Sequence, residues 1–197
     1  MSRKYLGLSK RKFTTLVSLV LTLVVLVAQQ QGWLKQASDA AQQNQPGTYK
    51  VLRYVDGDTI AVDMDGTSET IRFIGIDTPE THKPNTPVQC YGPAAAAHTK
   101  NLIASGGGRV RLAGDTLGTN RDRYDRLLRY VYLPDGQFVN EINIREGYAF
   151  YYPFFPFSKK VEFAAAQAEA QTTKRGLWGN CTPTPSGAGY KMEQSQS

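Results

Sequence analysis

The stretch TYKVLRYVDGDTIAVDMDGTSETIRFIGI, which runs from Thr48 to Ile76, decides the fold. It consists of β-branched and apolar runs that the dipeptide Asp-Gly interrupts twice, at Asp56-Gly57 and at Asp65-Gly66. Asp-Gly between such runs is the strongest short-range signal for a β-hairpin, because both residues tolerate the backbone of a tight turn. The stretch therefore predicts three antiparallel strands joined as a meander.

The chain after this meander supplies further strands and helices. Residues 109–114 and 126–136 read as strands, and the second of them ends in a Pro-Asp-Gly turn. Helical patterns with start or stop signals cover residues 91–108, 138–149 and 158–178. Five strands, with one helix after the third and two after the fifth, indicate a five-stranded barrel of the OB type. We therefore expect an α+β fold, mainly β, with three helices in the domain and an apolar helix before it.

Residues 1–34 differ from the rest of the chain in composition. Five basic residues and no acid occur among the first twelve, and an uncharged run rich in Leu and Val follows from Phe13 to Leu34. This order is typical of a signal peptide or of an uncleaved membrane anchor. Leu26-Val27-Ala28 is a poor cleavage site because Leu26 is large, which favours the anchor and leaves the signal open. In both cases the domain is expected outside the cytoplasm, either anchored to the membrane or secreted after cleavage.

The other residues divide into a linker, one domain and a tail. Residues 35–47 are polar, rich in Gln and end in Pro-Gly, which predicts a flexible linker. Residues 48–181 can form one core of ordinary size, whereas residues 182–197 contain too few apolar side chains to order themselves. The net charge of +6 falls to +1 without the five basic residues at the N-terminus. Bulk charge therefore does not indicate a basic nucleic-acid-binding domain, and any anion site must be local.

The chain contains two cysteines, Cys90 and Cys181. An even number of cysteines in an exported domain permits one disulfide. The alternative is a pair of unrelated buried thiols, because the sequence does not show whether the two side chains meet.

Arg72 lies in an apolar stretch that ends in two carboxylates, in the sequence RFIGIDTPE from Arg72 to Glu80. A buried arginine is costly unless an acidic partner or an anionic ligand neutralises it. Two further stretches combine charged and turn-forming residues, Asp56 to Thr59 and Asp122 to Arg126. Each stretch taken alone has a structural explanation, such as a solvated hairpin turn or a solvated strand edge.

Taken together, these stretches resemble the motifs of the staphylococcal-nuclease-like, or thermonuclease, family. The family motifs are D-G-D-T, a strand with R-x-x-x-x-D-T-P-E-T, Y-G-P at the start of a helix, and D-[KR]-Y-G-R. The chain has them in this order, as Asp56-Gly57-Asp58-Thr59, Arg72 with Asp77 to Thr81, Tyr91-Gly92-Pro93, and Asp122 to Arg126. The likeness covers residues 48 to 179, and the conjunction of motifs is far more specific than any one of them.

The resemblance implies a metal site and a set of catalytic residues. Asp58, Asp77 and the backbone carbonyl of Thr78 correspond to ligands of Ca²⁺, a hard cation that prefers oxygen ligands. Glu80 corresponds to the carboxylate that positions or deprotonates the attacking water. Arg72 and Arg126 correspond to two guanidinium groups that bind the phosphate and stabilise charge in the transition state.

Tyr124 and Asp125 lie within the second arginine motif. Tyr124 resembles a tyrosine that contacts the bound nucleotide. Asp125 occupies the position where the family commonly has glycine. Aspartate tolerates a left-handed turn, so the backbone can be preserved, but its carboxylate could also pair with Arg126 and weaken phosphate binding.

The sequence thus predicts a calcium-dependent endonuclease that hydrolyses phosphodiester bonds of DNA and RNA with low sequence specificity and leaves 3′-phosphates. The expected partners are DNA and RNA, together with the membrane if the N-terminal segment is uncleaved, and the domain is expected to act as a monomer. The main alternative is a catalytically weak module that binds nucleic acid or protein at the cell envelope. A third reading is an envelope structural protein that uses the barrel alone, and it predicts no metal-dependent cleavage.

Overall fold

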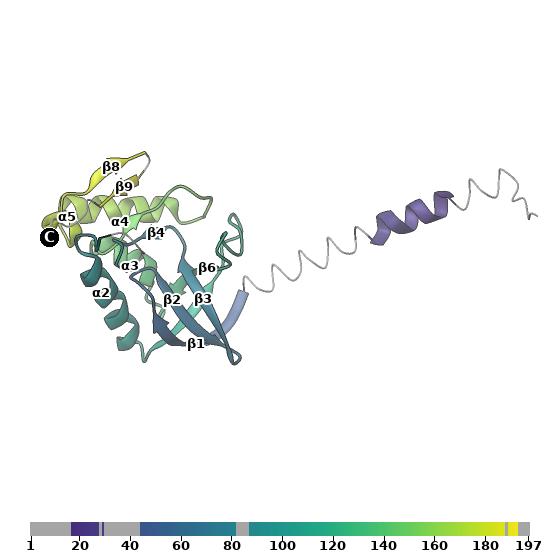
Figure 1. Cartoon of the computed structure of the whole chain (residues 1–197), viewed down its shortest axis with the longest axis horizontal. Coiled ribbons are helices and arrows are strands. Elements are labelled where there is room, and N and C mark those ends of the chain that lie inside the picture. Colours follow the sequence, from purple (N-terminus) through teal and green to yellow (C-terminus); the bar gives the residue numbers. More distant parts are fainter. Residues whose placement is uncertain (1–16, 28, 30–43, 82–86, 188, 193–197) are drawn as a thin grey trace, which may run out of the picture. The chain divides into compact units, whose positions relative to one another are not determined.

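The computed structural model describes residues 17–27, 29, 44–81, 87–187 and 189–192 (Figure 1). The chain divides into two compact units, Met1–Ala41 and Gln42–Ser197. In the first unit, residues 17–27 form a helix. Within the described parts of the chain, no helix is both long enough and apolar enough to cross a membrane. The rest of the predicted signal or anchor, and residues 35–43 of the predicted linker, lie outside the described residues.

The second unit is built on a closed barrel of five strands in the order β1-β2-β3-β6-β5. These strands are β1 (Asn44–Tyr54), β2 (Thr59–Met64), β3 (Thr67–Phe73), β5 (Arg109–Ala113) and β6 (Leu127–Tyr132). β1, β2 and β3 pair antiparallel in sequence order, and β5 pairs antiparallel with both β1 and β6. The parallel pairing of β3 with β6 closes the barrel. The predicted meander and the predicted five-stranded barrel are both confirmed.

The Asp65-Gly66 turn shows why the meander forms. Both residues have positive φ, 53° at Asp65 and 84° at Gly66, which is the backbone of a tight hairpin turn. The Gly66 amide also donates to the Asp63 carboxylate at 2.9 Å. The turn sets the register of β2 and β3, which places Ile60, Val62, Ile71 and Phe73 in the core.

Helices cover one side of the barrel, as Figure 1 shows. They are α2 (Gly92–Ser105), α3 (Val139–Arg145), α4 (Lys160–Thr172) and the short α5 (Leu177–Asn180). α3 packs between α2 and α4 and also contacts β6. The three predicted helices are therefore present in the domain, and α5 was not predicted as a separate helix. A second short pairing, of β4 (Ile76–Asp77) with β7 (Phe150–Tyr151), attaches the end of the β3 segment to the chain that follows α3.

Two predicted boundaries are wrong. β1 begins at Asn44 and pairs with β5, so residues 44–47 belong to the barrel rather than to a linker. The predicted disordered tail forms a hairpin of β8 (Thr184–Ser186) and β9 (Gly189–Lys191), while residues 193–197 lie outside the described residues. The hairpin orders because Tyr190 and Met192 pack on an apolar surface that the rest of the domain provides, namely Phe150, Leu177 and Trp178.

Cys90, which precedes α2, is joined by a disulfide to Cys181, which follows α5. The two sulfur atoms are 2.00 Å apart and the two Cα atoms 6.2 Å apart. Both cysteines pack against the same small core as the C-terminal hairpin. The bridge therefore ties the start of α2 to the C-terminal part of the domain.

Candidate active site

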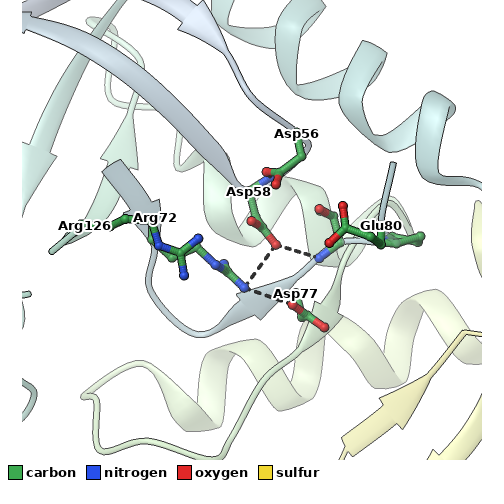
Figure 2. A pocket seen from close by; sticks show the side chains of 8 residues that line it. Asp56, Asp58, Arg72, Asp77, Glu80 and Arg126 are labelled. Carbon is green, nitrogen blue, oxygen red and sulfur yellow. Dashed lines mark hydrogen bonds and ion pairs between the residues drawn. The ribbon is translucent and has the colours of Figure 1, made fainter. Parts of the chain in front are cut away.

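One cavity of about 180 Å³ lies where the turn between β1 and β2, the strand β3 and the segment after β4 meet (Figure 2). It is lined by Asp56, Asp58, Arg72, Asp77, Thr78, Pro79, Glu80 and Arg126. The cavity thus brings together the six residues to which the sequence assigned metal-binding or catalytic roles. Tyr124, the predicted nucleotide contact, is not among the residues that line it.

The Asp56-Gly57-Asp58 turn packs directly against the segment that carries Asp77 and Thr78. Asp58 is buried, and its Oδ2 accepts a hydrogen bond from the Thr78 amide at 2.8 Å. A Cβ atom at Gly57 would lie 2.8 Å from Cγ2 of Thr78, a distance that real Cβ atoms essentially never show. Glycine at position 57 therefore allows the two segments to approach closely enough for Asp58 and Asp77 to face one cavity.

Arg72 lines the cavity, and neighbouring residues hold its guanidinium group in place. Its Nη1 donates to the carbonyl oxygens of Phe73 at 3.1 Å and of Ile76 at 2.8 Å. Its Nη2 lies 2.9 Å from Asp77 Oδ1 and 3.1 Å from Asp58 Oδ2 (Figure 2). Of the two alternatives that the sequence left open for Arg72, the structure shows the acidic partner, and phosphate binding stays a prediction.

The cavity carries more negative than positive charge. Four carboxylates line it, against the guanidinium groups of Arg72 and Arg126. Burial, together with the nearby charge of Asp58, raises the pKa of Asp56 to about 7. Burial also raises the pKa of Asp77 to about 6, although the charge of Arg72 opposes this shift. A bound cation would stabilise the ionised forms of these two carboxyl groups and so oppose the rise in their pKa values.

The oxygen-rich lining fits a hard cation such as Ca²⁺ in its donor chemistry. Among the residues that the structure describes, no group of three or more His, Cys, Asp or Glu side chains is arranged to hold a metal ion. A cation in this cavity would therefore rely on few carboxylates, with carbonyl and water oxygens as its other ligands, which is common for Ca²⁺. The residues present fit such an ion.

Arg126 is held by Asp122 and not by its neighbour Asp125. Asp122 Oδ2 lies 2.7 Å from both Nε and Nη2 of Arg126. Asp125 adopts a φ of 63°, the left-handed backbone that the family's glycine would supply. Its carboxylate is 87 % exposed and lies 3.6 Å from Nε of Arg121. Asp125 thus preserves the turn and leaves Arg126 to Asp122.

Tyr124 projects from the same loop and is 64 % exposed. Its ring lies beneath two guanidinium groups, at 4.7 Å from Arg123 Cζ and 5.4 Å from Arg126 Cζ. Arg123 also donates to the Tyr124 hydroxyl at 2.6 Å. Tyr124 therefore contacts Arg126, which lines the cavity, and its exposed ring can contact a ligand there.

Glu80 is fixed through its backbone as well as its side chain. Its amide donates to Gln89 Oε1 at 2.7 Å, and its Oε1 accepts from the Thr81 amide at 2.9 Å. Thr99 of α2 donates to the Gly57 carbonyl at 2.7 Å. α2 and the turn before it therefore support both the Asp56-Gly57-Asp58 turn and Glu80.

Sequence reasoning gave no role to Asp56, Gln89, Thr99 or Asp122. Asp56 and Asp122 stand inside recognised motifs, but Asp122 and Arg126 pair within a loop, where a spacing of four residues does not by itself predict an ion pair. Gln89 and Thr99 carry no local signal, because their roles depend on contacts with segments distant in sequence.

The barrel and its acidic, arginine-lined cavity define an OB-fold protein whose site can accept a cation and an anion together. Residues 70–180, more than half of the chain, match the model of the family described as staphylococcal nuclease homologue. The chain belongs to the staphylococcal nuclease family.

Curated relatives agree with this assignment. The chain is 43% identical over 179 residues to the thermonuclease of Staphylococcus hyicus, covering 86% of this chain and 99% of that protein. It is 41% identical over 175 residues to the thermonuclease of Staphylococcus intermedius, covering 85% and 98%. It is also similar to the endonuclease YncB of Bacillus subtilis (strain 168), at 42% identity over 128 residues, covering 64% of this chain and 59% of that protein.

Proposed function

We propose that this protein is a calcium-dependent endonuclease that hydrolyses phosphodiester bonds in DNA and RNA with low sequence specificity and leaves 3′-phosphate ends. One observation carries the proposal. A single cavity is faced by Asp58, Asp77, Glu80, Arg72 and Arg126, a set of charges that could bind a cation, bind a phosphate and orient a water molecule. Family membership and the names of the relatives support the same class of activity.

The acidic side of the cavity would hold the metal ion. Asp58, Asp77 and the carbonyl of Thr78 are the proposed ligands of Ca²⁺. When bound, the ion neutralises charge on a phosphate oxygen. The close packing of the Asp58 and Thr78 segments, made possible by Gly57, keeps these two residues next to each other at the cavity.

The two arginines would bind the phosphate. Arg72 is held in a fixed plane by the carbonyls of Phe73 and Ile76, so its guanidinium is oriented before the substrate arrives. Arg126 is oriented by Asp122 in the same way. Preorganised donors of this kind stabilise the negative charge that develops on the phosphate oxygens as water attacks.

Glu80 would accept a proton from the attacking water or aim that water at phosphorus. The backbone contacts of Glu80 with Gln89 and the contact of its Oε1 with Thr81 restrict where its carboxylate can lie. The Tyr124 ring, exposed beside Arg126, would contact a base or sugar of the bound nucleotide.

The protein is further proposed to act outside the cytoplasm, either anchored by its N-terminal segment or released from it. The disulfide between Cys90 and Cys181 supports this location, because such bridges persist in oxidising compartments. The enzyme is also proposed to act as a monomer.

The test is cleavage of single-stranded DNA, double-stranded DNA and RNA by the full-length protein with calcium, with magnesium and with chelator. We expect fragments in the calcium condition and in neither of the other two. All three substrates should be cleaved, and the fragments should have 3′-phosphate ends. Retarded but intact nucleic acid in every condition would instead indicate the binding module. Cleavage in the presence of chelator would contradict the metal requirement.

A further inference from the structure

The turn before α2 holds both backbone polar groups of Glu80 through one residue. Gln89 accepts from the Glu80 amide through its side-chain Oε1 at 2.7 Å. The backbone amide of Gln89 donates to the Glu80 carbonyl at 2.9 Å. Two hydrogen bonds between the same two residues fix both the position and the tilt of the Glu80 backbone.

Gly92, at the start of α2, lets this turn lie directly against the Glu80 segment. A Cβ atom at Gly92 would lie 2.9 Å from the Glu80 carbonyl oxygen and 3.2 Å from that of Pro79. Both neighbours are backbone atoms, which cannot move aside as the end of a flexible side chain can. The close contact therefore makes the position of Glu80 depend on the position of the turn.

Cys90, the residue that follows Gln89, holds the turn before α2 in place. Cys90 forms the disulfide with Cys181, and both pack against the small core of Phe150, Leu177 and Met192. Gln89 is thus one residue away from a covalent link to the C-terminal part of the domain. Its backbone carbonyl also accepts from the Gly92 amide at 3.0 Å, which closes the turn.

We propose that Gln89 is a positioning residue for Glu80 and that the Cys90–Cys181 bridge keeps Gln89 in place, so that turnover falls when the bridge is reduced. This inference rests on the proposed nuclease activity. In the reduction, a dithiol reagent supplies two electrons and two protons. The sulfur–sulfur bond breaks, Cys90 and Cys181 become thiols, and the reagent closes into its own cyclic disulfide.

The first part of the test compares variants of residue 89 in the oxidised full-length protein, with calcium and a defined DNA substrate. Gln89→Ala removes the acceptor for the Glu80 amide, and we expect kcat to fall between about tenfold and about 100-fold with KM changed by less than about twofold. Gln89→Glu keeps an oxygen at the same place and should restore most of kcat. Gln137→Ala makes the same chemical change at an exposed turn residue and serves as the matched control.

The second part compares oxidised and reduced protein. Reduction of the wild type should lower kcat by about tenfold or more while KM changes little. The double variant Cys90→Ser/Cys181→Ser should have the low kcat of the reduced wild type and should not respond to the dithiol. Near-ultraviolet circular dichroism at the assay temperature shows that each form is folded.

These outcomes separate the inference from the proposed function. Absence of calcium-dependent cleavage by the oxidised wild type would overturn the proposed function. Cleavage by the wild type, together with unchanged kcat in folded Gln89→Ala or in folded reduced protein, would overturn the positioning role alone. A loss in Gln89→Ala that Gln89→Glu does not restore would also overturn it, because the acceptor oxygen would then not be the cause.

Discussion

Asp122 and Arg126 form a close ion pair across one loop, with Asp122 Oδ2 at 2.7 Å from both Nε and Nη2 of the guanidinium. Asp122 also accepts from the backbone amides of Tyr124 and Arg126 through Oδ1, at 2.9 Å and 3.1 Å. Burial alone would raise the pKa of Asp122, but the hydrogen bonds from the Arg126 side chain and from the backbone amides of Arg126 and Tyr124 hold it below its ordinary value. The Asp122 carboxylate therefore stabilises the conformation of the loop and orients Arg126, which the proposed mechanism uses to bind the phosphate.

Asp122→Asn should reduce catalysis, because a neutral amide no longer forms the ion pair with Nε and Nη2 of Arg126. We expect kcat to fall by about tenfold, the equivalent of about 1.4 kcal/mol of transition-state stabilisation. Steady-state kinetics with calcium measures the change. Asp125→Asn, at an exposed carboxylate in the same loop, is the matched control and should be neutral. Equal kinetics for the two variants would contradict the role of Asp122 in orienting Arg126.

Asp125→Gly should leave kcat/KM within about twofold of the wild type, because the Asp125 carboxylate is exposed and faces Arg121 instead of Arg126. The φ of 63° is available to glycine without strain, so stability should change by less than about 1 kcal/mol. Asp125→Ala places a Cβ in the left-handed region without a compensating side-chain hydrogen bond and should cost about 1 kcal/mol. Urea unfolding measures both. A large gain in activity for Asp125→Gly would show that Asp125 weakens phosphate binding.

Arg72→Lys should lower kcat by about 10² to 10³ even though the positive charge is kept. The two Nη atoms of Arg72 bond to the carbonyls of Phe73 and Ile76 and to the carboxylates of Asp58 and Asp77, and one ammonium cannot reproduce that planar arrangement. Arg53→Lys, at an exposed residue of β1, controls for the general effect of the exchange. Thermal unfolding of both variants distinguishes a catalytic loss from unfolding, and kcat within about threefold of wild type in Arg72→Lys would contradict the role.

Ionised Asp115 should stabilise the folded domain, and this stabilisation should be lost in acid. Asp115 is buried and accepts from Tyr130 Oη, from Ser158 N and Oγ and from Leu117 N, at 2.6 to 2.8 Å. Burial alone would raise its pKa, but the hydrogen bonds from Ser158 and Tyr130 outweigh burial and hold the pKa below its ordinary value of 3.8. Because the folded pKa is the lower one, the stabilisation is complete above the ordinary value and is lost as pH falls through the folded pKa.

The variant Asp115→Asn tests this linkage. At neutral pH it should lower the free energy of unfolding by about 2 kcal/mol, and the difference from wild type should shrink steadily below about pH 4. Denaturant unfolding at several pH values provides the measurement, with Asp65→Asn at an exposed turn as control. A difference that stays constant down to about pH 2 would show that ionisation of Asp115 contributes nothing.

Local signals made the barrel readable from the sequence. The two Asp-Gly turns fixed the β1–β2–β3 meander because a hairpin turn depends on the residues within it. The C-terminal hairpin was missed because its order comes from the contacts of Tyr190 and Met192 with Phe150, Leu177 and Trp178, which lie in earlier parts of the chain. Composition within the tail carries no sign of that apolar surface.

The same distinction applies to the site. The charged residues of the cavity stand in short motifs, so the sequence located them and the structure places them around one space. The supporting contacts were not readable, because Thr99 reaches Gly57 and Gln89 reaches Glu80 across separations that no motif records. Arg72 shows the limit most clearly: its spacing from Asp77 was visible, whereas its second partner, Asp58, depends on how β2 and β3 pair.

The rate of hydrolysis of one defined double-stranded oligonucleotide, in a calcium titration with wild type and with Glu80→Gln, tests the central claim most directly. The account predicts a wild-type rate that rises with calcium to saturation and vanishes with chelator. It predicts for Glu80→Gln a saturating rate lower by about 10² to 10⁴ with the calcium midpoint changed little, because the variant loses the base and keeps the proposed metal ligands. A calcium-independent wild-type rate, or a Glu80→Gln rate equal to wild type, would contradict the claim that this cavity brings metal, arginines and base to one diester.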